Sequence, residues 1–134
     1  MWTAEQLRAI NEDGNLLVSA AAGAGKTAVM TERIARIIAS GTDVSEILVV
    51  TFTNPAAAEM KQRIERRLSE LAESTDDTKL KMHLHDSAIN ISTANISTIH
   101  SFCGNVLRRN CHIVGLDPAF RTADAAEAAL LRLK

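Results

Sequence analysis

The feature that most limits the fold of this chain is residues 20–27, AAAGAGKT, which lie between an apolar run and a helical pattern. The apolar run, residues 16–19, predicts a short buried strand. After the glycine-rich stretch, apolar residues recur at helical spacing from Val29 to Ile38, and Gly41 closes the expected helix. A strand that passes into a helix through a glycine-rich loop is typical of an α/β domain with a parallel sheet.

The stretch itself matches the phosphate-loop pattern GxxxxGK[ST] except at its first position, which is Ala20. Gly23 and Gly25 let the backbone curl so that successive N–H groups point inward around an anion. The following helix presents its positive end, Lys26 would contact the β- and γ-phosphates, and the Thr27 hydroxyl would bind Mg²⁺. The alternative is a glycine-rich turn without a ligand. The Gly-Lys-Thr placement between strand and helix favours ATP with Mg²⁺, held by residues 22–28: Ala22, Gly23, Ala24, Gly25, Lys26, Thr27 and Ala28.

The later segments continue the alternation of strands and helices. Residues 47–51 are fully apolar up to Thr51, as in a central parallel strand, and Asn54-Pro55 predicts a helix with Asn54 as its N-cap. Further helices are expected at residues 79–89 and 101–109, a strand at 96–99, and a last helix that Asp124 and Glu127 cap. We therefore expect an α/β fold of the P-loop NTPase (RecA-like) type, a parallel sheet flanked by helices. The last helix still runs at the final residue, which suggests a truncated part of something longer.

Three further segments carry polar groups suited to ligands. Gln6 lies about twenty residues before Lys26, and its carboxamide suits the donor and acceptor edge of adenine; the alternative is a solvated helix residue. Thr51, Phe52, Thr53 and Asn54 join a strand end to a helix start, where hydroxyls and amides can hold a backbone phosphate and Phe52 can stack on a base. The alternative there is a capped helix with Phe52 in the core. Thr98, His100 and Ser101 follow the next strand, where a lone histidine is usually structural.

Composition narrows the classes of partner and site. The net charge of −1 gives no global attraction to nucleic acid, so binding must come from a local patch. The arginines of residues 63–67 alternate with glutamate and predict a solvated helix face. His100, Cys103, Cys111 and His112 lack the spacing of a zinc site, and the cysteines are expected to be reduced core thiols. Neither a signal peptide nor an apolar run of membrane length is present, which favours a cytoplasmic protein without a membrane partner.

The ordered set of motifs resembles a known family. Gln6, then AAAGAGKT, then VVTFTNPAAAEMKQRI, then ISTIHSFC is similar to the N-terminal part of a superfamily 1 helicase of the UvrD/Rep class. Residues 2–6, Ala28 and residues 120–124 most resemble the AddA subunits of bacterial ATP-dependent helicase/nucleases. The resemblance implies that residues 1–134 begin the first RecA-like motor domain of an ATP-driven translocase on single-stranded DNA. It implies work in double-strand-break repair beside a second helicase-nuclease subunit.

The same resemblance assigns roles to particular residues. It implies that Gln6 contacts adenine, that Lys26 and Thr27 are catalytic, and that Thr27 binds Mg²⁺. It further implies that two segments contact DNA, composed of Thr51, Phe52, Thr53, Asn54, Thr98, His100 and Ser101. Ala28 and Pro55 depart from the family, in which many relatives carry arginine and lysine there.

The family's acidic strand motif does not occur in these 134 residues. The adjacent acid pairs, at residues 12–13 and 76–77, do not follow an apolar run. We therefore expect the chain alone to be a poor ATPase and no helicase. One alternative is a complete, non-catalytic nucleotide- or DNA-binding module, against which the intact Lys26 and Thr27 argue. A small-molecule kinase is disfavoured because an arginine-rich lid is not visible.

Overall fold

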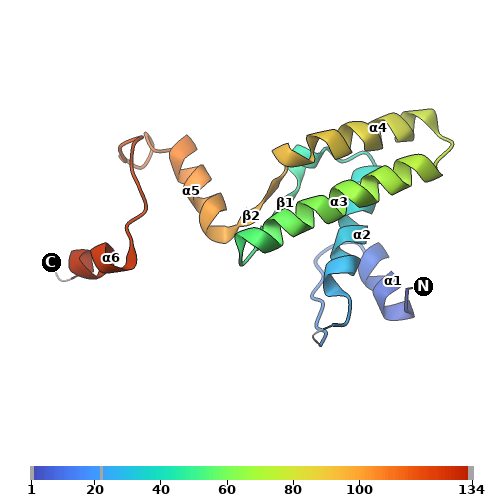
Figure 1. Cartoon of the computed structure of the whole chain (residues 1–134), viewed down its shortest axis with the longest axis horizontal. Coiled ribbons are helices and arrows are strands. Elements are labelled where there is room, and N and C mark those ends of the chain that lie inside the picture. Colours follow the sequence, from blue (N-terminus) through green and yellow to red (C-terminus); the bar gives the residue numbers. More distant parts are fainter. Residues whose placement is uncertain (1, 22, 133–134) are drawn as a thin grey trace. The chain divides into compact units, whose positions relative to one another are not determined.

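The computed structural model describes residues 2–21 and 23–132, and it divides after Ile99 into two compact units that are described separately. The helices and strands follow the expected alternation (Figure 1). In chain order they are α1 (Ala4–Asn11), α2 (Lys26–Ala39), β1 (Leu48–Thr51), α3 (Asn54–Ser74), α4 (Thr78–Ile89), β2 (Asn95–Thr98), α5 (Ile99–Arg109) and α6 (Ala125–Arg132). Short 3₁₀ turns at Val44–Glu46 and Asn90–Thr93 precede the two strands.

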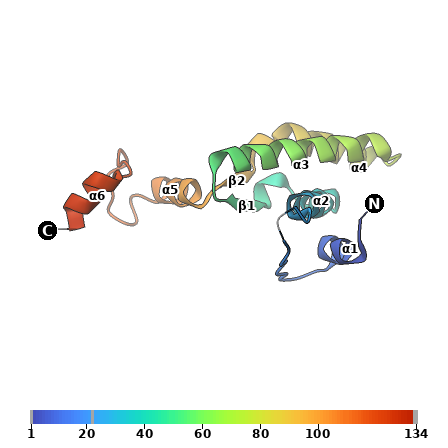
Figure 2. The same cartoon turned by 60° about the horizontal axis from the view of Figure 1, so that its bottom comes forward.

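The sheet of the first unit is a parallel pair. β1 and β2 run side by side in a register that matches Leu48 with Asn95 and Thr51 with Thr98. Parallel neighbours need a long crossover, which here is made by α3 and α4. Figure 2 shows α3 and α4 running together, with α2 against α3 and α1 beyond α2. The phosphate-loop helix α2 is thereby placed against the helix that follows β1.

The core of this unit lies between α2, α3 and α4 and the two strands. Its fully buried large side chains are Ile38, Ile64, Leu68 and Leu84. Ile64 and Leu68 belong to the apolar stripe predicted for α3, and that prediction is confirmed. Because these residues recur every three to four positions, one face of each helix is removed from water while the opposite face stays charged.

The predicted first strand is wrong for this structure. Residues 16–19 form no strand among the residues described, and the side chain of Leu17 is 94% exposed. A strand needs a neighbour for its backbone N–H and C=O groups, and in the described part of the chain β1 and β2 pair only with each other. The expected burial of residues 47–51 is also only partial, since Leu48 and Val50 are exposed. The described residues therefore form a mixed α/β arrangement with a two-stranded parallel sheet.

The helix caps correct one prediction and confirm another. Thr53, not Asn54, is the N-cap of α3: its hydroxyl accepts a hydrogen bond from the Ala56 amide at 3.3 Å, and Asn54 is the first helical residue. In the second unit, the Asp124 carboxylate accepts from the Glu127 amide at 2.8 Å, and the Glu127 carboxylate accepts from the Asp124 amide at 3.1 Å. This reciprocal pair caps α6 as predicted.

The second unit exposes most of its surface. Among its described residues α5 buries none of its side chains, although Cys111 beyond it is buried. Cys103 is exposed, so the prediction of a core thiol is wrong for that residue. Arg108 lies over the ring of Phe120, with 5.6 Å between the guanidinium carbon and the ring centroid. None of the helices described in either unit is both long and apolar enough to cross a membrane.

Candidate nucleotide-binding site

The glycine loop adopts the conformations that only glycine takes without strain. Gly23 has φ +79° and Gly25 has φ +78°, both in the left-handed region. Gly25 is the N-cap of the 14-residue helix α2, and within the described residues no side chain caps that helix end. The first amides of α2 therefore lack an intrahelical partner and point at the loop, which suits an anion. Ala22, predicted to be part of this loop, lies outside the described residues.

The Lys26 side chain folds back onto its own loop. Its ammonium donates hydrogen bonds to the carbonyl oxygen of Ala20 at 2.6 Å and to that of Ala21 at 2.8 Å. A positive charge is thus held at the loop by neutral carbonyl groups, which are weaker partners for an ammonium than phosphate oxygens. An incoming polyphosphate would exchange with these two carbonyls.

Gln6 joins helix α1 to the loop. Its side-chain oxygen accepts a hydrogen bond from the Thr3 amide at 2.9 Å, and its side-chain nitrogen donates to the Ala24 carbonyl at 3.3 Å. The Thr3 hydroxyl in turn accepts from the Gln6 amide at 3.2 Å, which completes a capping box at the start of α1. Sequence reasoning missed this box, although a threonine followed three residues later by glutamine is its signal. Gln6 is therefore more than a solvated helix residue.

A cavity of about 500 Å³ lies between α1 and the loop. This volume falls within the range of small-molecule sites. Its lining combines Gln6 with four of the predicted loop residues, namely Gly23, Ala24, Gly25 and Lys26. Val18 and Ser19, from the segment predicted as a strand, line it too. Thr27 and Ala28 do not line this cavity; Thr27 is exposed in the first turn of α2. Paired donors, a cation and unpaired helix amides are together suited to a nucleoside polyphosphate.

The turn after β1 presents its predicted residues outward. Phe52 is 99% exposed, so the alternative of a core phenylalanine is wrong. The Thr51 hydroxyl donates to the Thr53 carbonyl at 3.0 Å and steadies the turn, while Thr53 caps α3. Asn54 is exposed at the helix start. An aromatic face beside a helix N-terminus offers both a stacking surface and amide donors for a phosphate.

The second predicted DNA segment begins at the same sheet edge. Thr98 pairs with Thr51 in the β1–β2 register, so the carboxyl ends of both strands meet there. The Thr98 side chain is buried. His100 and Ser101 follow in the first turn of α5, in the second unit, and both are exposed. The structure thus brings Thr98 to Thr51, and describes His100 and Ser101 apart from them.

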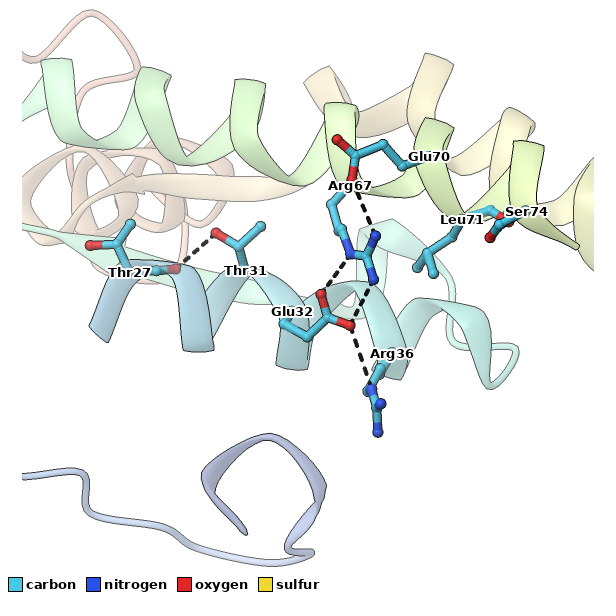
Figure 3. Close-up of polar contacts among 8 residues, drawn as sticks. All are labelled: Thr27, Thr31, Glu32, Arg36, Arg67, Glu70, Leu71 and Ser74. Atoms are coloured by element: carbon cyan, nitrogen blue, oxygen red, sulfur yellow. Dashed lines mark hydrogen bonds and ion pairs between the residues drawn. The ribbon is translucent and has the colours of Figure 1, made fainter. Parts of the chain in front are cut away.

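Sequence reasoning also missed a buried ion pair between α2 and α3, drawn in Figure 3. The guanidinium of Arg67 donates to both oxygens of Glu32, from Nε at 2.6 Å and from Nη2 at 3.0 Å. Glu32 is only 6% exposed, and these hydrogen bonds, against the desolvation of its carboxylate, lower its pKa. The solvated face predicted for residues 63–67 is therefore wrong for Arg67. It holds for Arg63, which is exposed and pairs with Glu59 on its own helix. An acidic residue inside the apolar stripe of α2 was the available signal.

Comparison with known proteins agrees with the site. The model of the UvrD/REP helicase N-terminal domain matches residues 2–133. Similar curated proteins are named as ATP-dependent helicase/nuclease subunits of the AddA type. That of Desulforamulus reducens is 51% identical over 98% of this chain and 11% of its own length. That of Heliobacterium modesticaldum is 50% identical over 98% of this chain and 9% of its own length. That of Clostridioides difficile is 44% identical over 98% of this chain and 10% of its own length. The chain spans about a tenth of these relatives, and with nearly all its residues matched by the family model it belongs to the UvrD/REP helicase N-terminal domain family.

Proposed function

We propose that this chain is the ATP-binding part of an ATP-dependent translocase and helicase on single-stranded DNA. The parent protein would be a helicase-nuclease subunit that acts in double-strand-break repair and recombination. The observation that carries the proposal is the cavity in which Gln6 and Lys26 face the start of α2 across two left-handed glycines. The names of the relatives, which are helicase/nuclease subunits, support the same activity.

The nucleotide would be held by groups that the site already positions. The amides of α2 and of the glycine loop would donate to phosphate oxygens, and Lys26 would exchange two carbonyls for the β- and γ-phosphates. The exposed Thr27 hydroxyl would bind Mg²⁺, which supplies charge neutralisation on the phosphates when bound. The Gln6 amide would exchange its contacts with Thr3 and Ala24 for the adenine edge.

Single-stranded DNA would bind at the carboxyl edge of β1 and β2. Phe52 offers a stacking face, and the start of α3 offers amides for a phosphate. The register that pairs Thr51 with Thr98 lets the two predicted segments begin at one place. Because the chain as a whole carries a net charge of −1, binding would depend on these local groups rather than on a general positive field.

Catalysis would need the rest of the parent protein, including a complete RecA-like sheet and a second motor domain. An arginine supplied from elsewhere contributes roughly 10³- to 10⁵-fold to such reactions. We therefore propose that the isolated chain binds ATP but hydrolyses it slowly. We also propose that the parent is cytoplasmic and works with a second helicase-nuclease subunit.

ATP hydrolysis by the full-length protein that contains this chain, measured with and without single-stranded oligonucleotide, tests the proposal. We expect hydrolysis that DNA stimulates, and unwinding of a duplex with a single-stranded end. The matched control is the same protein with Lys26→Ala. A full-length protein that binds ATP and DNA but does not hydrolyse ATP would identify a non-catalytic binding module instead.

A further inference from the structure

The ion pair between Glu32 and Arg67 differs from the other ion pairs of the described residues. Those others join residues no more than six positions apart. Glu32 and Arg67 lie 35 positions apart, on α2 and α3, and their side chains are only 8% and 32% exposed. The pair is therefore a tertiary contact between two helices, removed from most of the solvent.

The geometry fixes both partners. Arg67 uses Nε and Nη2 on the two oxygens of Glu32, while its Nη1 donates to Glu70 at 3.1 Å. Arg36, one turn further along α2, approaches the Glu32 carboxylate at 3.6 Å (Figure 3). A two-pronged contact of this kind has one favourable arrangement, whereas the apolar side chains around it can slide with little change in energy. The pair consequently defines the register of α2 against α3.

The two helices begin at the two predicted binding segments. Glu32 is six positions after Lys26, about 9 Å along α2, and Arg67 is thirteen positions after Asn54, about 20 Å along α3. A second polar contact lies nearer the loop. The Thr31 hydroxyl approaches the Met60 sulfur on α3 at 3.7 Å and donates to the Thr27 carbonyl at 2.9 Å. A displacement of the first turn of α2 would therefore be carried to α3 through side chains that are already in contact.

We propose that Glu32 and Arg67 are positioning residues that tie α2 to α3, so that nucleotide in the glycine loop changes the affinity of the turn at residues 51–54 for single-stranded DNA. This inference rests on the proposed function. The pair contacts neither ligand; it acts by making the two helices move as one body. Coupling of this kind is reciprocal, so DNA would change nucleotide affinity by the same factor.

The test uses the full-length protein and measures the dissociation constant of a single-stranded oligonucleotide with and without a non-hydrolysable ATP analogue. The variants are Glu32→Gln, Arg67→Gln and the double variant, which remove the ionic contact at nearly constant shape. Arg63→Gln is the matched control, because it removes an exposed arginine of the same helix whose ion pair stays within α3. Thermal unfolding and ATP-analogue affinity without DNA are measured for every variant.

We expect wild type and Arg63→Gln to share one coupling factor, within the range of about 5- to 150-fold typical of such links. In Glu32→Gln and Arg67→Gln the factor should fall close to one, with nucleotide affinity in the absence of DNA changed less than about twofold. The double variant should lose no more than either single variant, because both act through one contact. If the neutral variants do not fold, Arg67→Lys carries the test: it keeps the charge, loses the two-pronged contact and should lower the factor.

The outcomes separate this inference from the proposed function. A wild-type protein whose DNA affinity ignores nucleotide, and whose ATP hydrolysis ignores DNA, overturns both. Normal DNA-stimulated hydrolysis with an undiminished coupling factor in Glu32→Gln and Arg67→Gln, or in Arg67→Lys, overturns the inference alone. Equal loss of coupling in Arg63→Gln also overturns it, because that result assigns the effect to surface charge.

Discussion

Replacement of Lys26 by alanine separates nucleotide binding from folding. In the structure the Lys26 ammonium makes two local hydrogen bonds, to Ala20 and Ala21, on an exposed loop. Since water replaces such partners readily, their loss should lower the free energy of unfolding by less than about 1 kcal/mol. The fold of Lys26→Ala should therefore survive, which makes any loss of binding interpretable.

The expected loss of binding follows from what the ammonium exchanges. Each hydrogen bond to a charged phosphate contributes about 1.5–3 kcal/mol, whereas each carbonyl bond given up contributes about 0.5–1.5 kcal/mol. For two bonds the difference is about 2–3 kcal/mol, which is roughly a 30- to 150-fold higher dissociation constant for ATP-Mg²⁺. This difference is smaller than the total phosphate attraction because the loop itself already stabilises the lysine.

The assay is a calorimetric or fluorescence titration with ATP-Mg²⁺, beside chemical denaturation of each variant. Lys61→Ala is the matched control, because the Lys61 ammonium also donates to a backbone carbonyl, that of Ser92 at 3.2 Å, but on α3 away from the loop. Lys61→Ala should bind like wild type. An affinity of Lys26→Ala within about threefold of wild type, with an intact fold, would refute the role given to Lys26.

Three further variants or conditions have defined outcomes. Leu68→Ala should lower the free energy of unfolding by about 2–5 kcal/mol, because Leu68 is fully buried; Leu17→Ala, at a 94% exposed side chain, should change it by less than about 0.5 kcal/mol in the same denaturation assay. The lowered pKa of Glu32 means that its ionised form stabilises the fold, so the stability advantage of wild type over Glu32→Gln should be complete above pH 4.5 and shrink as the pH falls below it; an advantage independent of pH would contradict the ion pair. Gly25→Ala should cost about 1–2 kcal/mol for its positive φ and also weaken ATP binding, because the new Cβ would lie 3.2 Å from a side-chain amide of the site; Gly14→Ala, with a similar φ and open space, should show only the stability loss.

Local patterns predicted the helices and β1 and β2 well because the features that decide them lie within a few residues. The stripe that contains Ile64 and Leu68 predicted both the existence of α3 and its buried face. The pairing of Asp124 with Glu127 is a contact over three positions, and the structure has it as predicted. Moving the cap of α3 from Asn54 to Thr53 required only the choice between two adjacent capping side chains, which sequence alone does not settle.

Tertiary partners were not predictable from the same patterns. Residues 16–19 have strand composition, yet a strand exists only where another strand supplies hydrogen bonds, and among the described residues none lies beside them. Glu32 looked like an ordinary helix residue because its partner is 35 positions away. An acid in an apolar stripe announces that a partner exists, but the identity of Arg67 depends on how α2 and α3 cross.

The predicted ligand groups share a property that sequence does not reveal: the protein already satisfies them. Gln6 uses its donor and its acceptor on Ala24 and Thr3, and Lys26 occupies two loop carbonyls. Binding at this site is therefore an exchange of partners, in which only the difference between new and old contacts contributes to affinity. The lysine gains because phosphate is charged and a carbonyl is not. The glutamine exchanges neutral partners for neutral partners and gains little net energy, so its contribution is discrimination: a base whose edge cannot replace both contacts would leave the amide unsatisfied.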